Sequence, residues 1–145
     1  MVCQMPSKRV YVEHLRAIEL FAGFSRKELE VVASAGQHLS VPAGTTLITQ
    51  GDAGYDAYIL LVGEIQVKRN GRTVDTEHPG AIIGELALLD HAPRSASAVC
   101  ATDCDILVLS RGAFRGTLDR SPALTHKLMA ALAARVRELD NRAYG

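Results

Sequence analysis

One stretch of the chain combines residues that can bind an anion beside a hydroxyl group. It runs from Gly80 to Val99 and contains Glu85 and a single arginine, Arg94, among Pro, Ser, Ala and Val. Good helix formers over residues 84–89 predict one or two helical turns, whose first N–H groups can bind an anion. A guanidinium on an inward-facing apolar strand is costly unless it meets an anion, and its planar fork suits phosphate. Glu85 can accept a hydrogen bond from a sugar hydroxyl. The stretch therefore predicts a site for a phosphate, a hydroxyl and, between apolar walls, a base.

The other reactive residue types form no catalytic or metal-binding pattern. The five histidines are scattered, without an H-x-H or H-x-x-x-H pair, which argues against a metal enzyme on a similar barrel. A G-x-S-x-G motif, a phosphate-loop lysine and a carboxylate pair suited to acid–base chemistry are all missing. The odd set of Cys3, Cys100 and Cys104 argues against disulfides, and the last two are expected as small buried apolar residues. We therefore expect a binding protein with no metal and no cofactor, not an enzyme.

Composition narrows the class of protein further. The 145 residues are 48% hydrophobic, enough for one domain with its own core, and 16 basic residues balance 16 acidic ones. That balance argues against a nucleic-acid binder. Arg135, Arg137 and Arg142 alternate with Glu138 and Asp140, as on a solvated helix face. No apolar run approaches the roughly 18 residues of a membrane span, and the start does not resemble a signal peptide, so we expect a cytoplasmic protein.

The elements that must position the site fall into three zones. Residues 8–35 have helical spacing, and Ser25 with Glu28 forms a capping box at which a second helix should begin. Residues 36–110 predict short strands separated by turns, with Asn70-Gly71 as the clearest hairpin signal. Residues 111–145 are helical again, and Ser121-Pro122 should start an amphipathic helix. The pattern predicts a mostly β domain, an antiparallel barrel or sandwich flanked by helices at both ends.

Residues 84–96, Gly-Glu-Leu-Ala-Leu-Leu-Asp-His-Ala-Pro-Arg-Ser-Ala, resemble the phosphate-binding cassette of cyclic nucleotide-binding domains. That family includes bacterial catabolite regulators, regulatory subunits of cyclic-AMP-dependent kinases and cyclic-nucleotide-gated channels. The resemblance extends from about Phe21 through the final helix, and it includes the Gly51-Asp52-x-Gly54-x-x-x-Tyr58 turn and the Gly63-Glu64 bend. We call residues 84–96 the cassette.

The resemblance implies an antiparallel β-roll or jelly-roll barrel with flanking helices, and it implies a role for each site residue. Glu85, helped by the Gly84 amide, would bind the ribose 2′-hydroxyl. The cyclic phosphate would bind the amides of Leu86 and Ala87, the Arg94 guanidinium and the hydroxyl and amide of Ser95. Val67 and Val74, on the hairpin strands, would pack against the purine. The final helix would act as a lid or dimer seam, with residues near Leu139 and Asp140 reaching the base.

The sequence says less about which base is bound and about the effect of binding on a partner. Ser95 stands where many cyclic-AMP sites have Ala and many cyclic-GMP sites have Thr. Ser also occurs in bacterial cyclic-AMP regulators, so cyclic AMP is favoured and cyclic GMP is the alternative. Binding would shift the final helix and so act on an effector protein or on a second copy in a homodimer. The competing hypothesis is an interaction barrel that has lost its ligand. A third hypothesis is a regulatory piece of a channel, transporter, kinase or transcription regulator.

Overall fold

The computed structural model describes residues 8–90 and 92–144, so the prediction for Cys3 lies outside the described part. The described part begins with α1 (Lys8–Arg16), followed by a short 3-10 helix, η1 (Glu19–Phe21), and by α2 (Arg26–Ala35). Helix α2 starts at the predicted capping box, because the Ser25 hydroxyl accepts from the Glu28 amide and the Glu28 carboxylate accepts from the Ser25 amide.

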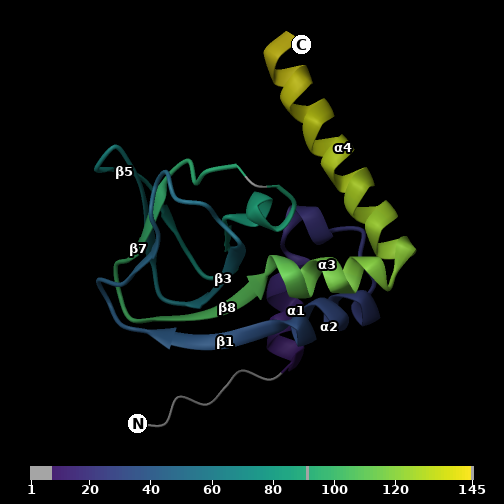
Figure 1. Cartoon of the computed structure of the whole chain (residues 1–145), viewed down its shortest axis with the longest axis horizontal. Helices are drawn as coiled ribbons and strands as arrows, with labels where there is room; N and C mark the ends of the chain where they lie inside the picture. Colours follow the sequence, from purple (N-terminus) through teal and green to yellow (C-terminus); the bar gives the residue numbers. More distant parts are fainter. Residues whose placement is uncertain (1–7, 91, 145) are drawn as a thin grey trace.

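Eight strands follow the N-terminal helices and form two antiparallel sheets. The strands are β1 (Gly36–Val41), β2 (Thr46–Ile48), β3 (Asp56–Val62), β4 (Ile65–Arg69), β5 (Arg72–Glu77), β6 (Ile82–Ile83), β7 (Ser97–Cys100) and β8 (Cys104–Ser110). One sheet has the order β1-β8-β3-β6 and the other the order β2-β7-β4-β5. The predicted mostly β fold, an antiparallel β-roll with helices at both ends, is confirmed (Figure 1).

The β4–β5 hairpin is confirmed at the predicted turn. Asn70 and Gly71 both have positive φ, 55° and 80°. A two-residue turn of this kind matches the twist of the flanking strands, and it needs residues that tolerate left-handed backbone. This hairpin forms one wall of the roll, and Figure 1 shows β5 at its outer edge.

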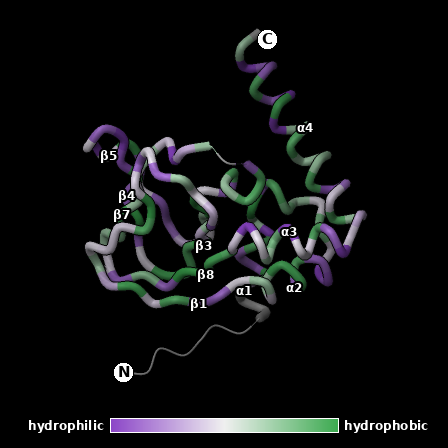
Figure 2. Tube along the Cα trace, viewed as in Figure 1, coloured by the Kyte–Doolittle hydropathy of each residue, from purple (hydrophilic) through white to green (hydrophobic). Residues whose placement is uncertain are grey.

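Two apolar clusters hold the layers together. The first lies between the helices and the outer face of the β3–β8 sheet, and the second lies inside the roll, between the two sheets. Strand β8 contributes to both, because Leu107 and Leu109 face the helices while Cys104 and Ile106 face the interior. Figure 2 shows hydrophobic segments on β8 and on the helices beside it. Cys100 and Cys104 are free thiols that are 1% and 2% exposed, as expected for small core residues.

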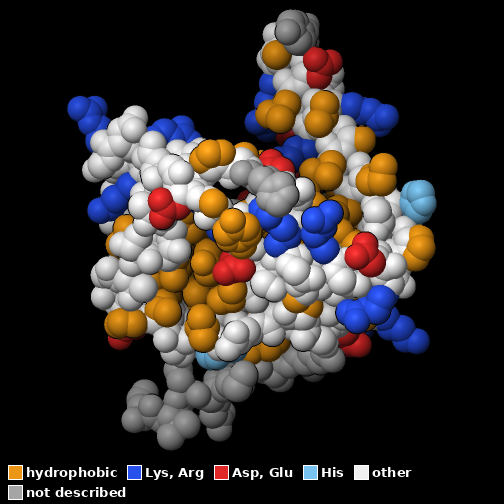
Figure 3. Space-filling view, in the orientation of Figure 1, with side chains coloured by type: hydrophobic (Ala, Val, Ile, Leu, Met, Phe, Trp, Pro, Cys, Tyr) orange, Lys and Arg blue, Asp and Glu red, His pale blue; other side chains and the backbone are white. Residues whose placement is uncertain are grey.

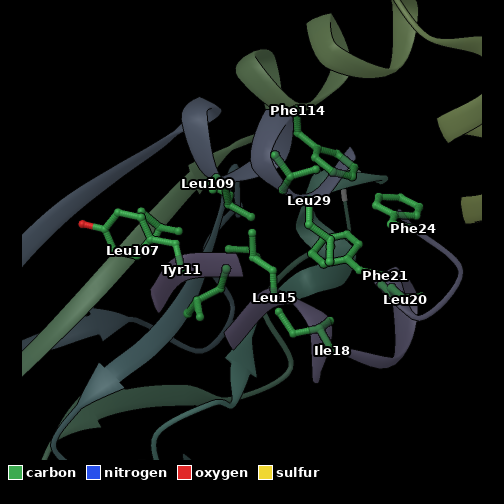
Figure 4. Close-up of a cluster of buried hydrophobic side chains, with 14 of the residues drawn as sticks. Tyr11, Leu15, Ile18, Leu20, Phe21, Phe24, Leu29, Leu107, Leu109 and Phe114 are labelled. Carbon is green, nitrogen blue, oxygen red and sulfur yellow. The ribbon is translucent and has the colours of Figure 1, made fainter. Parts of the chain in front are cut away.

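Aromatic side chains fill the centre of the helical cluster. Phe21 stacks on Phe24 with 5.2 Å between ring centroids, and Phe21 also contacts Phe114 at 6.0 Å (Figure 4). Burying side chains of this size contributes about 2–3 kcal/mol each to folding. The contact joins the N-terminal helices to the helix that follows β8, so these helices share one core.

Two helices end the chain. Helix α3 (Arg111–Asp119) packs beside β8, and α4 (Pro122–Tyr144) begins at the predicted Ser121 cap, whose hydroxyl accepts from the Leu124 amide. Leu124 and Leu128 of α4 are buried in the helical cluster. Beyond them the helix projects away from the body of the molecule (Figure 1). Lys127 pairs with Glu28 at 2.5 Å and so fastens the start of α4 to α2.

Candidate functional site

Arg94 lies at the centre of the site. It is in the loop before β7, so its expected place on a strand is wrong. The loop is fixed by two backbone hydrogen bonds, from the Arg94 amide to Asp52 O and from the Gly51 amide to Arg94 O, both 2.9 Å. The guanidinium donates to two carbonyl oxygens, Gly84 O at 3.3 Å and Asp56 O at 2.5 Å. These bonds hold the half-buried guanidinium of the cassette in place.

Two glycines leave the space that this guanidinium occupies. A Cβ atom on Gly54 would lie 2.1 Å from Arg94 Nε, and one on Gly84 would lie 2.2 Å from Arg94 Nη1. Gly84 also has φ +75°, in the left-handed region that favours glycine. The position of the Arg94 side chain therefore explains both Gly54, in the Gly51-Asp52-x-Gly54 turn, and Gly84, the first residue of the cassette.

The helical turn of the cassette, η2, spans Glu85–Leu88. The predicted short helix is therefore present, as a 3-10 turn with Gly84 as its N-cap. The Ala87 amide donates to Gly84 O at 3.1 Å within this turn. The Glu85 carboxylate accepts from the Arg135 guanidinium of α4, with 3.1 Å between Oε1 and Nη1. Arg135 therefore contacts the cassette, whereas the charge pattern predicts that it lies on a solvated helix face.

Cavities open on both sides of this group. One of about 290 Å³ extends into the roll, and its wall includes Gly84, Glu85, Arg94 and Ser95 together with apolar residues of the strands. A second, of about 340 Å³, shares those four residues and extends over η2 toward Pro93. Each is about the size of the smallest ligand pockets, which start at roughly 300 Å³. The interior cavity combines a cation, a carboxylate and apolar walls.

The structure brings most of the predicted site residues to these cavities. Val67 lines the interior cavity, and Leu86 and Ala87 line the outer one. Val74 lies on β5 with 55% of its side chain exposed and is not among the residues that line either cavity.

The two α4 residues expected near a base are not among the residues that line either cavity. Leu139 is 57% exposed and Asp140 is exposed, one helical turn beyond Arg135. Their predicted role depends on the position of α4 when a ligand is bound.

Two candidate functional residues were not predicted from the sequence. Arg111 is 8% exposed and donates to Ala87 O and Gly54 O, each at 2.8 Å, and also to Asp90 O. It therefore joins the cassette to the first residue of α3. The second candidate is Glu77 of β5, which lines the interior cavity. Burial is the main cause that raises the pKa of Glu77, and the nearby Asp75 and Glu85 carboxylates raise it further.

Across residues 8–90 and 92–144, no three His, Cys, Asp or Glu side chains are grouped so that they could hold a metal ion. Within that part of the chain, no helix is both long and apolar enough to cross a bilayer.

Comparison with known proteins gives one consistent result. A family profile described as "Cyclic nucleotide-binding domain" matches residues 38–121. The cyclic AMP receptor protein of Thermus thermophilus is 34% identical over 131 residues, which cover 87% of this chain and 61% of that protein. A cAMP-dependent protein kinase regulatory subunit of Pyricularia oryzae is 32% identical over 136 residues, or 92% of this chain and 35% of that protein. The chain thus spans less than two thirds of the length of these relatives.

A solved structure gives the same picture of the fold. The N-terminal domain of a transcriptional regulator from Streptomyces coelicolor A3(2) superimposes with a TM-score of 0.83 at 28% identity, covering 88% of this chain and 95% of that one. The match extends over the helices at both ends as well as the roll, because it covers more of the chain than the strands occupy.

Proposed function

The chain belongs to the cyclic nucleotide-binding domain family, and from that premise we propose that its 145 residues form one regulatory domain that binds cyclic AMP. The observation that carries this proposal is the meeting of Arg94, Gly84 and Glu85 at the mouth of one interior cavity. The domains of this family are regulatory and generally non-catalytic. We propose that this chain likewise has no catalytic activity and acts in the cytoplasm.

In this proposal the cyclic phosphate binds beside Arg94. The guanidinium now donates to two neutral carbonyls, and an anion would replace or add to these contacts with a stronger, charge-assisted bond. Ser95 and the Leu86 amide supply further donors, whereas the Ala87 amide already donates to Gly84 O. Glu85 accepts from the ribose 2′-hydroxyl, and Val67 with the isoleucines of the cavity wall packs against the base.

Cyclic AMP is the proposed ligand, with cyclic GMP as the alternative. The Thermus relative is named for cyclic AMP and the Pyricularia relative for dependence on it. Ser95 lines both cavities, so its hydroxyl is near any nucleotide bound there.

We further propose that binding moves α4. The Glu85 carboxylate that the ribose would use is engaged by Arg135 of α4, so ligand and helix compete for one acceptor. Arg111 supplies a second connection, because it ties the carbonyls of η2 and the Gly51-Asp52-x-Gly54 turn to α3, which leads into α4. A ligand that favours one arrangement of these contacts shifts the population of α4 positions.

The output surface is the projecting part of α4. Met129, Val136 and Leu139 are 57–65% exposed, and with Leu132 they recur at spacings of three and four residues. Such a stripe suits a second copy of the same helix in a coiled-coil dimer. Figure 3 shows hydrophobic side chains on this part of the helix. We propose a homodimer through α4, or an effector protein or domain that binds the same stripe.

The competing function is an interaction barrel that binds no nucleotide. Titration calorimetry on protein freed of bound nucleotide separates the two. Cyclic AMP should bind more tightly than cyclic GMP, and 5′-AMP, which lacks the cyclic phosphate, should bind at least about 100-fold more weakly. The absence of heat with both cyclic nucleotides at millimolar concentration would favour the interaction barrel.

A further inference from the structure

Glu77 faces the inside of the roll. In the β4–β5 ladder it lies directly opposite Ile65, and opposed residues of an antiparallel pair project from the same face of the sheet. Ile65 is fully buried in the interior cluster. Glu77 therefore shares the inward face, and its side chain lines the interior cavity together with Val67 of β4.

Glu77 is an acidic side chain on the apolar side of this cavity. The wall includes Ile48, Val67, Ile82 and Ile83 as well as the polar side chains of the cassette. The acidic neighbours Asp75 and Glu85 raise the pKa of Glu77 and so oppose its negative charge, and the Glu77 and Asp75 side chains share a hydrogen bond. The nearby His78, which pairs with Glu64 at 3.6 Å, acts in the opposite direction. A half-buried carboxylate in such surroundings lowers stability unless a hydrogen-bond donor reaches it. A leucine or valine at this position would pack against the apolar part of the wall without the cost of a half-buried charge.

The polar groups of the cavity are arranged in the same order as the phosphate, ribose and base of a cyclic nucleotide. Arg94, the proposed phosphate ligand, donates to the carbonyl of Gly84. Glu85, the proposed ribose ligand, is the next residue, and its charge acts on Glu77. A nucleotide held by Arg94 and Glu85 therefore extends its base toward the wall formed by β4, β5 and β6. The carboxylate there also repels a phosphate and so opposes the reversed orientation.

We propose that Glu77 reads the base, its carboxylate accepting a hydrogen bond from the exocyclic amino group. This inference rests on the proposed function and adds a specificity-determining residue to it. An ionised carboxylate only accepts hydrogen bonds, so it favours a base edge that donates. The 6-amino group of adenine and the 2-amino group of guanine share this chemistry, and a base without an amino group leaves the carboxylate unsatisfied.

The test compares nucleotides that differ in the amino group alone. Cyclic AMP is paired with purine riboside 3′,5′-cyclic monophosphate, which lacks the 6-amino group, and cyclic GMP is paired with cyclic IMP, which lacks the 2-amino group. In the wild-type chain, loss of the amino group should weaken binding about 10-fold in one pair, as expected for one hydrogen bond to a charged group. The pair in which this occurs identifies the amino group that Glu77 contacts.

Variants assign the effect to this side chain. Glu77→Leu should bind both members of the pair equally, and Glu77→Gln, which keeps an acceptor oxygen, should retain part of the discrimination. Glu13→Leu, a matched change of an exposed acid on α1 that lines neither cavity, should discriminate like the wild type. Thermal unfolding of each variant shows that the fold is intact.

The outcomes separate this inference from the proposed function. Binding of cyclic AMP or cyclic GMP with less than a 2-fold effect of the amino group in both pairs overturns the role of Glu77 and leaves the proposed function standing. Undiminished discrimination by Glu77→Leu does the same. A failure of both cyclic nucleotides to bind the wild-type chain overturns the two together.

Discussion

The guanidinium of Arg135 donates to the carboxylate of Glu85 across 50 positions of sequence, with 3.1 Å between Nη1 and Oε1. Glu85 begins the helical turn of the cassette, and Arg135 lies on α4 beyond the buried Leu124 and Leu128. The contact therefore joins the proposed ribose ligand to the proposed output helix. In the proposed mechanism, a bound nucleotide would have to displace Arg135 or share the carboxylate with it.

Removing this ion pair should strengthen nucleotide binding. The Glu85 and Arg135 side chains are 20% and 36% exposed, so their contact is worth at most about 1 kcal/mol. Arg135→Ala should therefore tighten cyclic AMP binding by up to about 5-fold in calorimetry. Arg137→Ala, at an exposed position of the same helix, is the control and should leave affinity unchanged. Weaker binding by Arg135→Ala would mean that Arg135 helps to hold the ligand instead of competing with it.

Gly84 should tolerate no side chain. Its φ of +75° costs alanine about 1–2 kcal/mol, and a Cβ atom would collide with the Arg94 guanidinium. Gly84→Ala should lower the free energy of unfolding in urea by at least that amount and weaken cyclic AMP binding at least about 10-fold. Gly112→Ala adds the same atom on α3, where nothing lies within 4 Å, and should leave both quantities unchanged or stabilise the fold by up to about 1 kcal/mol. Equal effects of the two changes would contradict this account of Gly84.

Arg111 should be required for a stable cassette. Its guanidinium is buried and donates to the carbonyls of Ala87, Gly54 and Asp90. Arg111→Met leaves those acceptors without this donor, so we expect a loss of about 3 kcal/mol in urea unfolding and weaker cyclic AMP binding. Arg115→Met, at an exposed position of the same helix, should cost less than about 0.5 kcal/mol. A loss below about 1 kcal/mol for Arg111→Met would show that α3 does not hold the cassette.

Glu77 should make the ligand-free fold less stable as the pH rises. Burial raises the pKa of this carboxyl above its ordinary 4.5, so the folded chain binds the proton more tightly than the unfolded chain. The stability that this proton supplies is complete below the ordinary pKa and is lost as the pH rises through the higher folded pKa. Glu77→Gln, which carries no charge, should therefore exceed the wild type in free energy of unfolding at pH 7.5, by a margin that shrinks toward pH 4.5. A margin that grows on acidification would reverse the assigned direction.

Local sequence signals predicted those parts of the fold that depend on neighbouring residues. The Ser25–Glu28 capping box, the Asn70-Gly71 turn and the Ser121 cap all lie where expected, because each is set by backbone hydrogen bonds within a few positions. The alternation along β8 was predictable for the same reason, since a strand must divide its side chains between two faces.

Contacts between distant segments were not predictable in this way. Nothing in the spacing of Arg111 indicates that it binds carbonyls of the cassette, and Arg135 resembles its solvated neighbours on α4. The cassette itself was found because its residue types are unusual together, but Arg94 was placed on a strand, although it lies in a loop that backbone bonds hold in place. The register of β5, which turns Glu77 inward, depends on the bulge between Val67 and Lys68, which has no clear sequence signal.

Thermal unfolding with and without cyclic AMP, in the wild type and in Arg94→Leu, tests the central claim most directly. At about 100 times its dissociation constant the nucleotide should stabilise the wild type by roughly 2.7 kcal/mol, a rise in Tm of about 5–10 °C. Arg94→Leu should show no rise, whereas Arg72→Leu, an exposed arginine on β5, should show the full one. An equal rise in Arg94→Leu, or none in the wild type at millimolar cyclic AMP, would contradict the assignment of this cavity as a cyclic nucleotide site.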